Sequence, residues 1–294
     1  MSFLTTLLQG KCIELNENNL SGAIRIRSQL LYNSSYITKA HFPSTVTEIE
    51  DVAFYKCSSL SDVHFSEGLK SIGNSTFAGC SSLTKISLPS TLENIGDSAF
   101  GHPTMDSNQD WLEEIEGLDT LNPSVIIWRG SFGSYSPWFL SHTGAVLVSQ
   151  GRLLLGYVNE FEPIPETVTH LAKEFMGSIE WTKQPSTLII PDSVQRLPVI
   201  WGTWSFTNSI CKKVVVGTGV SEMMSGSMQI VGDTVWVCKQ PANLQLSLPE
   251  KGLAYNKQAA TMTLYTDNLS LKQYNWSADN VTATIRPLSE APED

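Results

Sequence analysis

The sequence Ile72-Gly-Asn-Ser-Thr-Phe77-Ala-Gly-Cys80-Ser-Ser-Leu83-Thr-Lys-Ile86-Ser-Leu88-Pro89-Ser-Thr-Leu92 recurs in related form every 23 residues. Five apolar columns keep this step. They are Ile26, Ile49, Ile72 and Ile95; Leu31, Phe54, Phe77 and Phe100; Ile37, Leu60 and Leu83; Phe42, Phe65 and Leu88; and Val46, Leu69 and Leu92. A unit this short cannot bury its apolar side alone, so a fixed period of this length predicts a solenoid of stacked units.

Each unit contains one short strand. The alternation Ile86-Ser87-Leu88 sends two side chains inward and one outward, Pro89 ends the strand, and the Ser-, Gly- and Asn-rich stretch returns the chain. The predicted fold is therefore mainly β, with short turns and helical segments around one parallel sheet.

Two motifs of the units are shared with a known family. The second unit has Ala53-Phe54 and Cys57-Ser-Ser-Leu60, and the third has Ile86-Ser-Leu88-Pro89. Over residues 24–101 the chain resembles the BspA-like (spirochaete-type) leucine-rich repeat. The resemblance implies a curved solenoid with one short strand per repeat, in surface-exposed, secreted or virion-borne proteins that bind other molecules.

The repeat becomes irregular after residue 101. Residues 102–110 read as an insertion, and two apolar runs around Ser149-Gln150-Gly151 predict a β-hairpin within an inserted segment at about 137–158. The predicted organisation is an N-terminal leader or cap over 1–23, a leucine-rich repeat solenoid over 24–258, a C-terminal cap over 259–288 and a solvated acidic tail over 289–294. The cap is assigned because residues 264–288 resemble the end of such arrays, where an open last coil would expose apolar surface.

Composition narrows the partners and the setting. The net charge is −10 and only 16% of residues are charged, which argues against nucleic acid. No apolar run reaches about 18 residues, so membrane insertion is not expected. Residues 1–11 lack the features of a signal peptide. For a family usually found outside cells, this favours a bacteriophage virion or tail-associated protein that contacts the host surface or neighbouring virion proteins. The alternative is a bacterial cell-surface or secreted adhesin.

Catalytic motifs are missing from the sequence, which has no Gly-x-Ser-x-Gly, no His-Glu-x-x-His and no P-loop. We therefore expect a non-enzymatic interaction protein without a cofactor. A second alternative, a glycan-binding or glycan-cleaving module, needs a pair of carboxylates at catalytic spacing. Glu114 and Glu116 come nearest to such a pair.

The outward-facing strand positions are the candidate binding face. Aligning the units gives two columns: Lys39, Asp62, Lys85, Glu114, Thr187 and Lys213 in the first, and His41, His64, Ser87, Glu116, Ile189 and Val215 in the second. His41 and His64 with Asp62 could hold a metal ion. We instead predict an ordinary surface ladder in which Asp62 pairs with Lys39 and Lys85, and no metal site.

Six of the eight tryptophans lie between residues 111 and 204, where the repeat is irregular. Trp181, Trp201 and Trp204 form a candidate aromatic patch, since aromatic rings stack on sugar faces. Filling of irregular coils, or a contact in a homo-oligomer, is the favoured interpretation.

Cys57 and Cys80 occupy the same position of adjacent units. A small buried side chain packs well there, so free thiols are predicted. The alternative is a Cys57–Cys80 disulfide, because adjacent coils lie about 4.8 Å apart, close to the Cα separation that a disulfide allows.

Overall fold

The computed structural model describes residues 14–102, 111–133, 136–158, 160–176, 185–200, 211–228, 234–250, 252–254 and 259–293. The chain divides into two compact units. Unit 1 comprises Met1–His142 and Val148–Gln150, and unit 2 comprises Thr143–Leu147 and Gly151–Asp294. Each unit is described by itself.

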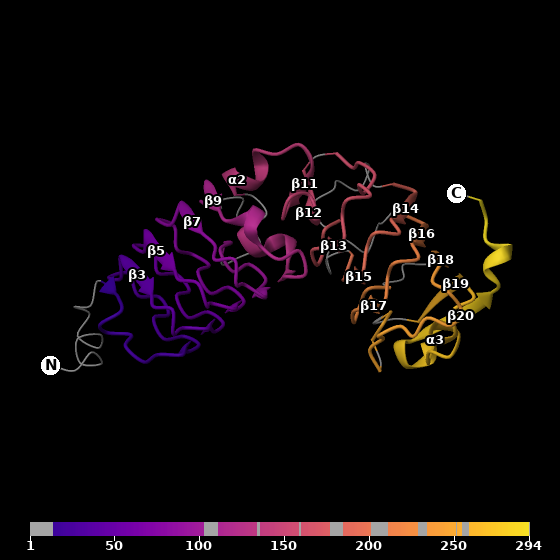
Figure 1. Cartoon of the computed structure of the whole chain (residues 1–294), viewed down its shortest axis with the longest axis horizontal. Helices are drawn as coiled ribbons and strands as arrows, with labels where there is room; N and C mark the ends of the chain where they lie inside the picture. The colour runs from indigo at the N-terminus through magenta and orange to yellow at the C-terminus, as the bar shows by residue number, and fades with distance from the viewer. Residues whose placement is uncertain are drawn as a thin grey trace. The chain divides into compact units, whose positions relative to one another are not determined.

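Unit 1 is a parallel β-solenoid with two ladders of strands (Figure 1). The first ladder contains β1 (Glu14–Leu15), β3 (Lys39–Phe42) and β5 (Asp62–Phe65), followed by the pair β7 (Lys85–Ser87) and β9 (Glu114–Glu116). The second ladder is one sheet of two-residue strands: β2 (Arg25–Ile26), β4 (Glu48–Ile49), β6 (Ser71–Ile72), β8 (Asn94–Ile95) and β10 (Ile126–Ile127). The predicted leucine-rich repeat solenoid is confirmed, but its strands are shared among several sheets because each coil is extended at two places.

The core of unit 1 consists of the five columns, and every one of their residues is buried. Phe54, Phe77, Phe100 and Phe132 form a continuous ring stack, with successive centroids 5.1, 5.3 and 6.0 Å apart. These spacings are close to the separation of parallel strands, so each ring fills its own coil and contacts the rings before and after it.

The turns between strands also repeat. Gln29, Val52, Ser75 and Ser98 are 23 residues apart, and all have a positive φ, between 50° and 60°. Their neighbours are joined by coil-to-coil backbone hydrogen bonds, such as the 2.9 Å bond from the Phe54 amide to the Thr76 carbonyl. The backbone is therefore paired between coils in the turns as well as in the strands.

The cysteine column holds free thiols, as the sequence predicts. The Cys57 Sγ donates to the Leu31 carbonyl at 3.0 Å, and the Cys80 Sγ donates to the Phe54 carbonyl at 3.2 Å. Burial raises the pKa of Cys57 to about 11. Cys12 lies outside the described residues.

Unit 2 contains three groups of strands. Near its start, β11 (Gly144–Val148, of which 144–147 belong to this unit), β12 (Leu153–Val158) and β13 (His170–Leu171) form a sheet where the sequence predicts a hairpin. Parallel strands β14 (Thr187–Ile190), β16 (Lys213–Val216), β18 (Thr234–Cys238), β19 (Ala260–Thr266) and β20 (Val281–Arg286) make the main sheet. A third pair is β15 (Arg196–Leu197) with β17 (Glu222–Met223).

Helical segments are short. They are η1 (Leu118–Thr120), η2 (Arg129–Phe132) and α2 (Pro137–Leu140) in unit 1, and α3 (Leu269–Lys272), η4 (Trp276–Asp279) and η5 (Leu288–Glu290) in unit 2. Within the described ranges, we find no helix with the length and apolarity needed to cross a bilayer.

The C-terminal part of unit 2 closes its apolar core. The Trp276 side chain is buried with the core residues of the preceding coils, and its ring lies 4.7 Å from that of Tyr274. The Asp279 carboxylate accepts hydrogen bonds from the Ala254 amide and the Tyr274 hydroxyl, both at 2.9 Å. These groups therefore bind the end of the array to the coil that contains Ala254.

Removing one ring of the stack should leave a cavity. Because Phe77 is fully buried between Phe54 and Phe100, Phe77→Ala should reduce the free energy of unfolding by about 3–5 kcal/mol. Lys85→Ala, an exposed change, should leave the melting temperature nearly unchanged. Equal melting temperatures for the two variants would contradict the column assignment.

The left-handed turn position should favour a different residue at Val52. A β-branched side chain at φ 53° is strained by about 1–2 kcal/mol, whereas Asn tolerates this conformation. Val52→Asn should therefore raise stability by about 1 kcal/mol in urea unfolding. The matched control is Val63→Asn in β5, which should lower it, since Asn is unfavourable in a strand.

Candidate functional site

The outward ladder of unit 1 is the candidate site. We define it as the exposed or half-exposed strand residues Lys39, His41, Asp62, His64, Lys85, Ser87, Glu114 and Glu116. The strand register pairs Lys39 with Asp62 and His41 with His64. It likewise pairs Lys85 with Glu114 and Ser87 with Glu116. Because inward residues such as Ala40 and Ile86 are buried, the alternation presents these eight side chains on one face.

The charges of this ladder pair differently from the prediction. Lys39 Nζ lies 3.4 Å from a Glu14 oxygen, and His41 Nε2 lies 3.1 Å from Asp62 Oδ2. Lys85 Nζ contacts Glu114 and Glu116 at 3.0 and 2.7 Å. The predicted Lys39–Asp62–Lys85 pairing is therefore wrong. Lys39 pairs with Glu14 on the preceding strand, β1, and Lys85 pairs with Glu114 and Glu116 on the following strand, β9. Asp62 contacts the His41 imidazole.

Lys85 is the centre of a three-residue charge group. Hydrogen bonds to Glu116 and then Glu114 raise the pKa of the Lys85 ammonium. Both carboxylates come from β9, and both bind the same cation from one side. A glycosidase instead needs its two carboxylates to flank the bond that is cleaved. This geometry therefore gives the glycan-cleaving alternative no support.

His41 and His64 are neighbours, with ring centroids 6.0 Å apart in an edge-to-face arrangement. With Asp62 they are the three side chains that could have formed a metal site. No set of three or more His, Cys, Asp or Glu side chains in the described ranges is arranged to hold a metal ion.

In unit 2 the same two columns have a different character. Thr187 pairs with Lys213 and Ile189 pairs with Val215, as the alignment predicts. However, Val215 is only 1% exposed, so it cannot be an outward binding residue. The C-terminal segment lies over this face, since Lys213 Nζ binds the backbone carbonyls of Pro292 and Glu293.

The candidate aromatic patch, Trp181, Trp201 and Trp204, lies outside the described residues. Among the other tryptophans of the irregular stretch, Trp138 is half-buried. Its ring centroid is 5.8 Å from that of Phe132 and 4.9 Å from that of His142. This ring therefore packs among aromatic neighbours, which fits the filling of irregular coils.

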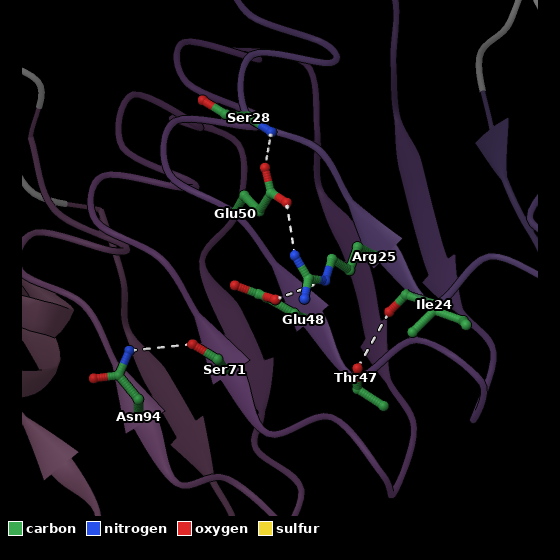
Figure 2. A network of polar contacts seen from close by, with 8 residues as sticks. All are labelled: Ile24, Arg25, Ser28, Thr47, Glu48, Glu50, Ser71 and Asn94. Carbon is green, nitrogen blue, oxygen red and sulfur yellow. Dashed lines mark hydrogen bonds and ion pairs between the residues drawn. The ribbon is translucent and has the colours of Figure 1, made fainter.

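Sequence reasoning missed a second polar row, on the short strands of the second ladder. The strand register aligns Arg25, Glu48, Ser71 and Asn94. Figure 2 shows the Arg25 guanidinium between Glu48 and Glu50, at 3.1 and 3.9 Å. The 23-residue spacing could have revealed this row, because each of these residues directly precedes a member of the Ile26 column.

The first coil of this row borders an open depression lined by Ile24, Arg25, Arg27 and Glu50. Glu50 is held in place by a 3.0 Å hydrogen bond from the Ser28 amide (Figure 2). Further along the row, Asn94 donates to Ser71 at 3.2 Å. These contacts join successive coils, so the row has a structural role.

Five solved chains match this one, among them three of low identity. A leucine-rich repeat protein from Bacteroides ovatus is 17% identical, with 90% of this chain and 87% of that chain covered and a TM-score of 0.34. A leucine rich cell surface protein from Faecalibacterium prausnitzii is 17% identical (89% and 82% covered, TM-score 0.30). The pneumococcal vaccine antigen PcpA is 12% identical (86% and 80% covered, TM-score 0.30).

No curated protein matches the sequence. The family model described as "BspA type Leucine rich repeat region" matches residues 10–109 in six copies. This range contains the five apolar columns and both ladders of the regular coils. Residues 10–109 therefore carry BspA-type leucine-rich repeats.

Proposed function

We propose that the protein is a non-enzymatic interaction module that binds a macromolecular partner through the outward ladder of unit 1. The observation that carries this proposal is the composition of that face. Four coils and β1 present lysine, histidine and carboxylate side chains in register, and these are 42–57% exposed in the ion pairs they form. The solenoid provides a rigid support for them.

These ion pairs have little to do with stability. An exposed pair contributes roughly 0–1 kcal/mol to folding, since water screens the charges and long side chains lose freedom. On binding, the same charged side chains can pair with charged groups of another molecule and no longer with each other. A complementary protein surface with both signs of charge would gain specificity and a faster association rate from them. We therefore expect a protein partner in preference to a neutral glycan.

Of the two candidate roles, we favour a bacterial cell-surface or secreted adhesin over a phage virion protein. The adhesin interpretation depends on the repeat family, and residues 10–109 match that family. The virion interpretation depends on the amino-acid sequence of residues 1–11 alone. A virion or tail-associated role is the second candidate.

Charge reversal at one lysine tests the face. Lys85→Glu should weaken binding of the labelled protein to intact cells about fivefold, because a surface charge contact is worth up to about 1 kcal/mol. The measurement is flow cytometry with increasing protein concentration, on bacteria of the source species and on cells of their host. Binding by the unmodified protein should also weaken with salt.

The matched control is Lys70→Glu. Lys70 is also exposed, pairs with Glu93 at 2.8 Å, and belongs to unit 1 but not to the outward ladder. Lys70→Glu makes the same change of charge as Lys85→Glu. Because Lys70 lies outside the outward ladder, this variant should bind as the unmodified protein does. Equal loss in both variants would indicate a general charge effect and contradict the assigned face. Finding the protein in purified phage particles, without cell binding, would favour the second candidate.

A further inference from the structure

One outward row of the main sheet of unit 2 is apolar on three strands, before it continues with Tyr265 on β19 and Arg286 on β20. Ile189, Val215 and Val237 occupy successive strands β14, β16 and β18 in direct register. In unit 1 the corresponding column is His41, His64, Ser87 and Glu116. An apolar row on the outside of a sheet needs a cover, since exposed apolar surface of this kind favours association.

Two members of the row are covered and one is open. Val215 and Val237 are 1% and 3% exposed, but Ile189 is 49% exposed. Tyr265 of β19 lies beside Val237 in this row, and other groups must lie over Val215. The row is therefore covered at β16 and β18 and open at β14.

The C-terminal segment is in the right place to be this cover. After β20 the chain turns back along the outer side of the sheet (Figure 1). Lys213 Nζ, on β16, donates to the Pro292 carbonyl at 3.0 Å and to the Glu293 carbonyl at 2.8 Å. Leu288 and Ala291 are half-buried, whereas Ser289, Glu290, Pro292 and Glu293 are exposed. Leu288 and Ala291 are thus the residues of the segment that are turned away from solvent.

The segment is held by few and replaceable contacts. Apart from the two Lys213 bonds, the Leu288 amide donates to Asp267 at 3.4 Å, and Arg286 pairs with Glu290 at 3.4 Å. The segment consists of one 3₁₀ turn, η5, between Pro287 and Ala291, whose φ and ψ are −58° and 146°, and −62° and 139°. Such a turn is not part of a strand ladder, so the segment can leave without breaking the sheet.

We propose that the outward face of β14, β16 and β18 is a docking surface for a short, acidic, proline-containing segment, and that residues 287–293 occupy it in cis as a removable cover. The apolar row receives the small apolar side chains of such a segment, and Lys213 binds its carbonyl groups. This proposal concerns unit 2 and does not depend on the function proposed for unit 1.

A peptide competition experiment tests the docking surface on the full-length chain. Leu288→Glu should release the segment by placing a carboxylate at a half-buried position beside Asp267. A fluorescein-labelled peptide of residues 287–294 should then bind this variant, by anisotropy, at least about tenfold more tightly than it binds the unmodified protein. The reason is that the attached segment competes at an effective concentration in the millimolar range.

Two controls define the contact. Lys213→Ala added to Leu288→Glu should abolish peptide binding, whereas Lys39→Ala, at the corresponding position of unit 1, should not change it. A scrambled peptide should not bind. Equal affinity of the unmodified and released proteins, or no binding to either, would overturn the proposal. A dimer that dissociates in the Leu288→Glu variant would overturn the cis assignment and identify the segment of a second copy as the occupant.

Limited digestion gives an independent readout if Leu288→Glu does not fold. Carboxypeptidase should remove residues 294–288 several-fold faster from Lys213→Ala than from the unmodified protein or Lys39→Ala. Equal rates in all three would show that Lys213 does not hold the segment, and would contradict the proposal.

Discussion

Pairing between each coil and the next, one period further along the chain, is the constraint on which the fold of unit 1 depends. The amide of Glu50 bonds to the carbonyl of Ile26, that of Gly73 to Ile49, and that of Gly96 to Ile72. Apolar side chains at the same step complete the core between these bonds. A short unit cannot stand alone, so both the backbone groups and the apolar face of every coil are satisfied by its neighbours.

The same constraint creates the surface that we propose for binding. A strand that buries every second residue must expose the others, and parallel stacking brings the exposed residues of successive coils into rows. In unit 1 these rows carry charges that contribute little to folding. Binding to a partner, and not stability, can therefore determine which residues occupy them. In unit 2 the equivalent row is apolar and buried at Val215 and Val237, and Lys213 of the same sheet binds the C-terminal segment that we propose as its cover.

The sequence predicted the features that repeat. Columns such as Phe54, Phe77 and Phe100 could be found because burial requires the same kind of residue at every period, and the strand register followed from them. Features set by a single tertiary contact could not be found. The partner of Lys85 depends on which carboxylate lies on the next coil, across the 102–110 insertion. Lys213 contacts Pro292 and Glu293, about 80 residues further along the chain. The row containing Arg25 was predictable from its period, since each of its residues directly precedes a member of the Ile26 column.

Deletion of one complete period tests the central claim most directly. Removing residues 73–95 joins Ile72 to Gly96, which reproduces the Ile72-Gly73 junction and restores every column. We predict a folded protein with a cooperative, somewhat lower thermal transition by circular dichroism. Removing only residues 73–84 shifts the columns out of register, and that variant should not unfold cooperatively. If the two deletions behaved alike, stability would not depend on the 23-residue pairing of coils.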